Sequence, residues 1–149
     1  MENVFKHVLV ATDGSLLADK AIQLALRLGG GARVTALLVM HDYGLSDYLQ
    51  AVVSSRPDAT ELREEILAEG RRLLDEAVVR AVQGDTRVER RVVISGKSPR
   101  HEIVATAQRE NCDLIVMSSH GLGGKMAHLL GSQSQGVLSM ATVPVMIVR

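Results

Sequence analysis

Short runs of apolar residues alternate along this chain with longer segments in which apolar residues recur every three or four positions. A short, continuous apolar run is typical of a strand buried on both faces of a sheet, and the longer spacing is typical of an amphipathic helix. The runs predict strands at residues 7–11, 34–40, 88–95, 114–117 and 143–148. The segments between them predict helices at residues 16–28, 59–82 and 99–110, and a last helix that begins near Gly131.

Strands and helices therefore alternate, and the chain ends on a strand. This order predicts an α/β fold, in which a parallel sheet has right-handed crossovers and helices on both faces. We expect a Rossmann-like, five-stranded parallel sheet in the order 3-2-1-4-5. The whole chain, residues 1–149, is expected to form one domain, since this length can bury a core of its own. Residues 41–57 are irregular and are expected to form a long loop that orders on binding.

Polar residues at the predicted helix starts support these boundaries. Ser15 is placed to cap the first helix, and Asp58 with Glu61 after it resembles a capping box. Ser98 followed by Pro99 has the pattern of an N-cap and a first helical position. The expected core-facing residues are Ala21, Leu24, Ala25 and Leu28 in the first helix, Leu62, Ile66, Leu73, Leu74, Ala77 and Val78 in the second, Ile103, Val104 and Ala107 in the third, and Val137, Leu138 and Ala141 in the last.

The composition excludes several classes of function. Lysine plus arginine equal aspartate plus glutamate, 17 each, and aromatic residues are scarce, which argues against nucleic acid as a partner. Cys112 is the only cysteine, so an internal disulfide and a thiolate metal site are excluded, and the histidines lack zinc-binding spacing. No apolar run approaches the roughly 20 residues of a membrane helix, and the amino end lacks the apolar core of a signal peptide. We expect a protein of the reducing cytoplasm that has no membrane partner.

The letters Gly96, Lys97 and Ser98 resemble the end of a phosphate-binding loop. A Walker A motif, G-x-x-x-x-G-K-[ST], also needs a glycine at position 91, where Arg91 stands. A helix cap at Ser98 explains the same letters, so we reject the interpretation as a Walker A motif.

The most informative stretch lies between residues 114 and 137. Its apolar run ends in two serines, His120 and Gly121, as expected where a buried strand leaves a sheet, and Gly131 then opens the last helix. In the expected sheet, ligands bind beyond the carboxyl ends of the first and fourth strands, where the winding reverses. Unpaired N–H groups at a helix start favour phosphate, so these turns predict an anion site. The alternative is that the glycines only turn the chain and Ser132 only caps a helix.

Several segments resemble the universal stress protein family, and the likeness covers the whole length: VLVATDGS near the amino end, then GKSPRHEIVATA, CDLIVMSSHG, and LLGSQSQGVLSMATVPVMIV near the carboxyl end. Nucleotide-binding members of that family carry G-x-x-G, a nine-residue spacer and then G-[ST]. Gly121, the spacer 122–130, Gly131 and Ser132 match this pattern, whereas Ser118 stands in place of the first glycine.

The resemblance implies an adenine-nucleotide site at the carboxyl ends of the first and fourth strands. The implied site residues are Ala11, Thr12, Asp13, Met40, Met117, Ser118, His120, Gly121, Gly131, Ser132, Gln133 and Ser134. Asp13 is implied to lie near the ribose or a metal-bound phosphate, and the Met40 backbone to read the adenine edge. The segment 131–134 is implied to hold the phosphates with N–H and hydroxyl groups. Lys125 and His128 add positive charge if they face a triphosphate.

Three of these residues have a purely structural alternative: Asp13 forms a turn, Met40 fills the core, and His120 is an exposed loop residue. The function implied by the resemblance is that of a cytoplasmic ATP-binding stress-response or regulatory protein that takes ATP, ADP or AMP, with or without Mg²⁺. A homodimer through the carboxyl-terminal strand is expected, since that short apolar strand lies at a sheet edge. The alternatives are a nucleotide-free homodimeric interaction protein, which Ser118 allows, and a slow ATPase that uses Asp13 with Mg²⁺.

Overall fold

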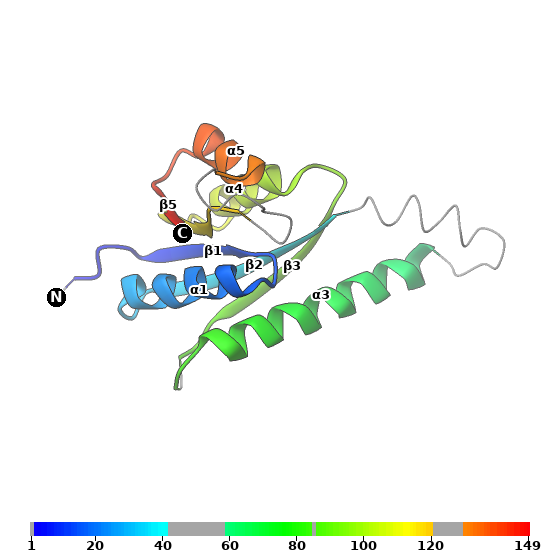
Figure 1. Cartoon of the computed structure of the whole chain (residues 1–149), viewed down its shortest axis with the longest axis horizontal. Coiled ribbons are helices and arrows are strands. Elements are labelled where there is room, and N and C mark those ends of the chain that lie inside the picture. The colour runs from blue at the N-terminus through cyan, green and yellow to red at the C-terminus, as the bar shows by residue number, and fades with distance from the viewer. Residues whose placement is uncertain (1, 42–58, 85, 121–129) are drawn as a thin grey trace.

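The computed structural model describes residues 2–41, 59–84, 86–120 and 130–149 and has a layered α/β architecture (Figure 1). The strands are β1 (His7–Thr12), β2 (Arg33–His41), β3 (Glu89–Ser95), β4 (Leu114–Ser118) and β5 (Val145–Val148). The helices are α1 (Leu16–Gly29), α3 (Ala59–Ala81), α4 (Pro99–Arg109) and α5 (Ser132–Met140). Helices α1 and α3 cover one face of the sheet, and α4 and α5 cover the other (Figure 1).

The sheet has the order β3-β2-β1-β4-β5, and every neighbouring pair of strands is parallel. This confirms the predicted α/β fold and strand order. Ala11 near the end of β1 pairs with Leu37 of β2 on one side and with Met117 of β4 on the other. The carboxyl ends of β1 and β4 therefore lie side by side at the point where the winding reverses, which is where open α/β sheets bind ligands.

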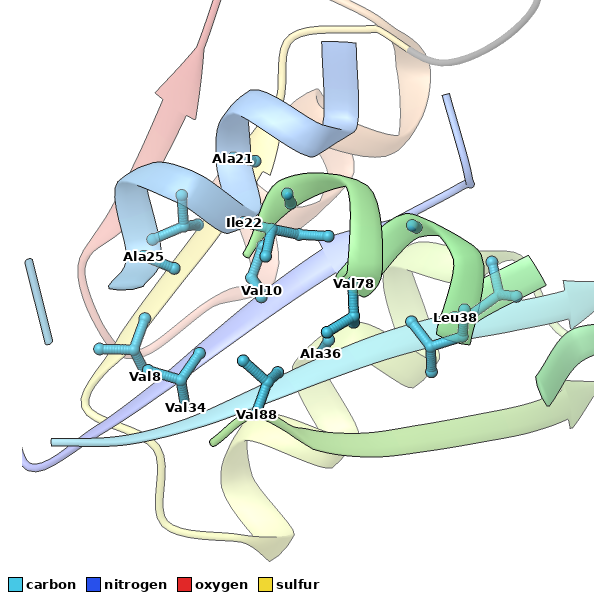
Figure 2. Packing of buried hydrophobic residues seen from close by; sticks show 14 of the residues in the cluster. Val8, Val10, Ala21, Ile22, Ala25, Val34, Ala36, Leu38, Val78 and Val88 are labelled. Atoms are coloured by element: carbon cyan, nitrogen blue, oxygen red, sulfur yellow. The ribbon is translucent and has the colours of Figure 1, made fainter. Parts of the chain in front are cut away.

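Alternating side chains of the central strands build two separate cores. Val8 and Val10 point toward α1 and α3 and belong to the same apolar cluster as Ile22 (Figure 2). Leu9 and Ala11 point to the opposite face and pack among residues of α4 and α5. Successive residues of a strand face opposite sides of a sheet. Only every second residue of each strand can therefore reach the α4 side.

The helix faces are largely those that the hydrophobic pattern predicts. Ala21, Ala25, Leu62, Leu74, Ala77, Val78, Ile103, Val104, Ala107 and Val137 are buried, as expected. Leu24, Leu28, Ile66 and Leu73 are only partly buried. These four residues lie at the edges of the apolar faces of their helices. On α1 the centre of the buried face is occupied by Ala18 and Ile22 instead.

The expected burial of Leu138 is wrong. α5 turns Ser134 and Val137 toward the rest of the molecule, and both are almost completely buried. One residue further along a helix is rotated by about 100°, so Leu138 points away from that face and is 43% exposed. Ala141 lies beyond the last turn as the C-cap residue and is partly buried.

Local hydrogen bonds explain where several helices begin. The Ser15 hydroxyl oxygen accepts the N–H of Ala18 at 3.2 Å, which confirms the predicted cap of α1. Ser98 occupies the N-cap position before Pro99, as predicted, but its hydroxyl hydrogen-bonds Nδ1 of His101 at 2.8 Å and caps no backbone N–H. The start of α4 therefore takes its acceptor from elsewhere.

The last strand is shorter than predicted. β5 begins at Val145 instead of Val143, because Pro144 lacks the N–H that a strand residue needs. Pro144 still contributes its carbonyl, which accepts the N–H of Ile115 at 3.0 Å. The loop predicted at 41–57 starts one residue too early, since His41 is the last residue of β2. The rest of that loop and the predicted cap at Asp58 lie outside the described residues.

Candidate functional site

Three turns meet at the carboxyl edge of the sheet: the turn after β1, the turn after β4 and the start of α5. They surround an open pocket of about 370 Å³, within the range of roughly 300–1,000 Å³ that is usual for small-molecule sites. Its lining residues are Ala11, Thr12, Asp13, Leu37, Val39, Pro99, Ile103, Met117, Ser118, His120, Gly131, Ser132, Gln133 and Ser134.

The inner wall of this pocket is apolar. Leu37 and Val39 of β2 and Met117 of β4 lie on the α4 side of the sheet, and Ile103 of α4 packs with the same core. A wall of this kind favours a flat ring system over a charged group, because the ring leaves water at little cost.

The turn after β1 is held by its own polar side chains. Thr12 Oγ1 accepts the N–H of Gly14 at 3.1 Å, and Asp13 Oδ1 accepts the N–H of Ser15 at 2.9 Å. Gly14 has a φ of 83°, a conformation that favours glycine. The structural alternative for Asp13, a turn former, is thus observed, and its carboxylate also lines the pocket.

A second layer of contacts fixes this turn from the other face of the sheet. Arg80 of α3 donates to the carbonyl of Gly14 at 3.0 Å and to Oδ2 of Asp19 at 2.9 Å. The hydrogen bond to Asp19 is the main reason that the pKa of Arg80 is raised further above its usual range. The turn between β1 and α1, which borders the pocket, is therefore anchored to α3.

The turn after β4 is a compact network of serines. The Ser118 hydroxyl donates to the carbonyl of His120 at 3.1 Å, and a 2.9 Å hydrogen bond joins Ser119 Oγ to Nδ1 of His120. The Ser119 N–H donates to the carbonyl of Val148 at 2.8 Å, which ties the turn to the end of β5. His120 thus lines the pocket with its backbone and its ring both held.

The start of α5 lies directly against this turn. Gly131 is the N-cap residue, which corrects the alternative that Ser132 caps the helix, since Ser132 is its first helical residue. The Gly131 N–H donates to the carbonyl of Ser119 at 2.6 Å. A Cβ at position 131 would lie 3.2 Å from that carbonyl oxygen and 3.3 Å from Cα of His120, so any other residue would push these backbone atoms a few tenths of an ångström away.

Gln133 joins the pocket to α4. Its side-chain Oε1 accepts the N–H of Arg100 at 2.9 Å and so supplies the acceptor that Ser98 does not provide at the start of α4. α5 therefore contributes one side chain to the amino end of a neighbouring helix and its own amino end to the pocket.

The structure brings all but two of the predicted site residues to this pocket. The exceptions are Met40 and Gly121. The side chain of Met40 packs in the core on the α3 side, and its Cγ lies 3.1 Å from where a Cβ on Gly70 would be, so core filler is its observed side-chain role. Gly121, Lys125 and His128 lie outside the described residues.

The apolar wall of the pocket is not among the features that the sequence predicts. Leu37, Val39, Pro99 and Ile103 line the pocket without belonging to any polar motif. The alternation of side chains along β2 was the signal that could have found it. Once Ala11 and its partner Leu37 are placed on the α4 side, Val39 faces the same side and Met40 faces the opposite one.

Other ligand chemistries find no support in the described part of the chain. No group of three or more histidine, cysteine, aspartate or glutamate side chains among those residues is arranged to hold a metal ion. Burial, the largest contribution, raises the pKa of the Cys112 thiol to about 11 and keeps it protonated at neutral pH. None of the described helices combines the length and the hydropathy that a membrane crossing requires.

Together these features define a doubly wound α/β protein with a ligand-sized pocket at the switch point of its sheet. The model of the universal stress protein family matches residues 5–149. A universal stress protein from Thermus aquaticus is 36% identical over 147 residues, which cover 98% of this chain and 100% of the relative. The chain belongs to the universal stress protein family.

Solved structures share this fold. The protein MJ0577 of Methanocaldococcus jannaschii superposes with a TM-score of 0.77 at 24% identity, covering 96% of this chain and 94% of its own. A universal stress protein in complex with cAMP superposes with a TM-score of 0.59 at 24% identity, covering 97% of each chain. One from Archaeoglobus fulgidus in complex with dAMP also gives 0.59, at 17% identity, covering 98% of this chain and 99% of its own.

Proposed function

We propose that this chain binds an adenine nucleotide in the pocket beyond β1 and β4 and acts as a cytoplasmic, nucleotide-dependent regulatory protein in the stress response. The observation that carries this proposal is the division of the pocket into an apolar wall and a polar end. A nucleotide has the same division, since its base is a flat ring system and its phosphate is an anion. The apolar wall accommodates the base, and the start of α5 receives the phosphate.

The charge distribution of the helices supports an anion at α5. The first turns of α1, α3 and α4 contain the acidic residues Asp19, Glu61 and Glu102, respectively, whereas the first turn of α5 contains none. An acidic side chain at this position would compensate the positive end of the helix dipole and would repel phosphate. The N–H groups of the first turn, which lack intrahelical acceptors, are therefore available to an anionic ligand.

The two liganded relatives support the choice of an adenine nucleotide. Their ligands, cAMP and dAMP, share an adenine base and a sugar phosphate. We extend this class to ATP and ADP, whose additional phosphates would extend from the α5 end toward Asp13. One carboxylate plus phosphate oxygens is a usual environment for Mg²⁺, so Asp13 is the residue we expect beside a metal-bound triphosphate.

We further propose that the chain forms a homodimer through β5. Among the described strands, β5 is the last in the sheet and pairs with β4 alone, and its residues Val145–Val148 are apolar and partly buried. An apolar edge strand readily pairs with another copy of itself. Light scattering is expected to give twice the mass of the chain at micromolar concentration, and the mass of one chain would contradict the dimer.

Substitutions at Ser132 test the phosphate site without damaging the helix. Ser132 is exposed in the first turn of α5, where an aspartate stabilises a helix by about 0.3–1 kcal/mol. The same carboxylate would repel a bound phosphate. Ser132→Asp is therefore expected to weaken AMP binding about tenfold or more in calorimetric titrations while the thermal midpoint stays the same or rises. Ser132→Asn is the control, because asparagine has the size of aspartate but no charge, and it is expected to retain AMP binding within about threefold.

Two results would contradict the proposal. Equal affinity of the aspartate and asparagine variants would place the phosphate away from α5. Absence of heat at millimolar nucleotide, together with absence of adenine nucleotide in the heat extract of the purified protein, would favour a nucleotide-free interaction protein. Titrations of ATP with and without Mg²⁺ complete the series, because only the triphosphate is expected to gain from the metal.

A further inference from the structure

The carbonyl of Ser119 is a junction between the sheet and the start of α5. It accepts two hydrogen bonds, one from the Gly131 N–H at 2.6 Å and one from the Ser134 hydroxyl at 2.6 Å. A carbonyl oxygen has two lone pairs, so both are in use. The N–H of the same Ser119 is held by the carbonyl of Val148 in β5. The junction is therefore fixed to the sheet on one side and to α5 on the other.

Ser134 contributes more than a polar surface to this junction. It is only 1% exposed, and its hydroxyl has a single proton, which it donates across to Ser119. The hydroxyl oxygen also lies 3.3 Å from the carbonyl of Gly131. A hydroxyl with its proton engaged in this way has no proton left to donate to a phosphate.

Apart from the bonds to Ser119, two side chains fix the amino end of α5: Gln133 Oε1 accepts the N–H of Arg100 at 2.9 Å, and Gln135 Nε2 donates to the carbonyl of Leu130 at 3.1 Å. Gly131 has no side chain to cap the helix, and Ser132 lies inside the first turn. The helix has nine residues, among them Gly136, and a short helix with an internal glycine has little stability of its own. The bonds to Ser119 are the ones that join the first turn of α5 to the turn after β4, so they contribute directly to the position of its first N–H groups.

We propose that Ser134 is a positioning residue of the phosphate site: its hydroxyl bond to Ser119 sets the place and direction of the first N–H groups of α5, and those N–H groups bind the phosphate. This inference rests on the proposed nucleotide function and replaces one role that the family resemblance implied, in which the Ser134 hydroxyl itself holds the phosphate. The base is bound elsewhere in the pocket, so Ser134 affects the phosphate only.

The test compares Ser134→Ala with Ser139→Ala. The Ser139 hydroxyl also donates to a carbonyl, that of Gln135 at 3.0 Å, but this bond stays within α5 and is exposed. Two quantities are measured: calorimetric affinity for AMP and for adenosine, and amide hydrogen exchange of Gly131 in the nucleotide-free protein. Ser134→Ala is expected to weaken AMP binding roughly tenfold, to leave adenosine binding within about twofold, and to speed exchange of the Gly131 amide roughly fivefold to tenfold. Ser139→Ala is expected to change none of these.

Each other result overturns the proposal. Weaker AMP binding with unchanged Gly131 exchange would make the Ser134 hydroxyl a direct ligand. An equal loss of AMP and adenosine, or the same losses in Ser139→Ala, would show general loosening of the helix. If the unsubstituted protein bound neither AMP nor adenosine, the proposed function would fail, and unchanged Gly131 exchange in Ser134→Ala would then also exclude the positioning role.

Discussion

Gly131 shows how a single missing side chain shapes the pocket. Its backbone φ is −67°, which any residue can adopt, so the need for glycine comes from space alone. A Cβ there would press on the backbone of Ser119 and His120, neither of which is a flexible group. Gly131→Ala is therefore expected to displace the start of α5, destabilise the fold by about 1–3 kcal/mol, and weaken AMP binding at least roughly tenfold.

Gly136 supplies the matched control for this prediction. A Cβ at position 136 would meet Cδ and Cγ of Arg100, which can take another rotamer, and would lie 3.2 Å from its Cβ, which requires a small shift. Alanine is also the better helix former by about 1 kcal/mol. Gly136→Ala is expected to retain nucleotide affinity and most of its stability in calorimetry and urea unfolding. Equal nucleotide affinities in the two alanine variants would show that the close approach at Gly131 does not shape the site.

At the scale of elements, Asp113 joins the starts of two central strands. Its carboxylate accepts the N–H groups of Lys6 at 2.8 Å and His7 at 3.0 Å, at the start of β1, while Asp113 itself directly precedes β4. Burial, the largest single effect, would raise the pKa of this carboxyl, but the N–H groups of Lys6, His7 and Asp113 itself, together with the side chain of His7, outweigh it, and the pKa lies below the usual 3.8. The carboxylate form is therefore bound more favourably in the folded than in the unfolded chain.

The lowered pKa predicts the direction of a pH dependence. A group with a lowered folded-state pKa stabilises the fold fully above its unfolded pKa, and this contribution is lost as pH falls through the folded value. Urea unfolding is expected to show Asp113→Asn less stable than the unsubstituted protein at neutral pH, with the difference shrinking between about pH 5 and pH 3. A difference that stays constant over this window would contradict the role of the charge.

The elements also show where sequence reasoning succeeds and where it stops. The alternation of strands and helices predicted a parallel sheet, because right-handed crossovers leave few topologies for such a chain. The order 3-2-1-4-5 was a choice among those topologies, and the structure confirms it. Burial of Leu138 was wrong, because a short helix offers too few apolar positions to define its face. The junction at Ser119 depends on contacts between residues far apart in the chain, and no local pattern marks it.

At the scale of the whole molecule, one face of the sheet carries the larger apolar core and the other face carries the pocket. The α1 and α3 side carries the larger apolar core, to which Met40 belongs. The α4 and α5 side leaves a pocket open at the switch point, bordered by Ala11, Met117 and the start of α5. The sequence predicted that these turns converge. The apolar wall of the pocket could be recognised only once the structure showed which strand residues face the α4 side.

An NMR titration of the isotope-labelled protein with AMP tests this account most directly. We predict saturable shifts of the backbone amide signals of Thr12, Ser132 and Gln133, which line the pocket, and constant signals for Asn111 and Arg33 at the opposite edge of the sheet. Saturable shifts centred on another surface, or no shifts at millimolar AMP, would contradict a nucleotide site at the switch point.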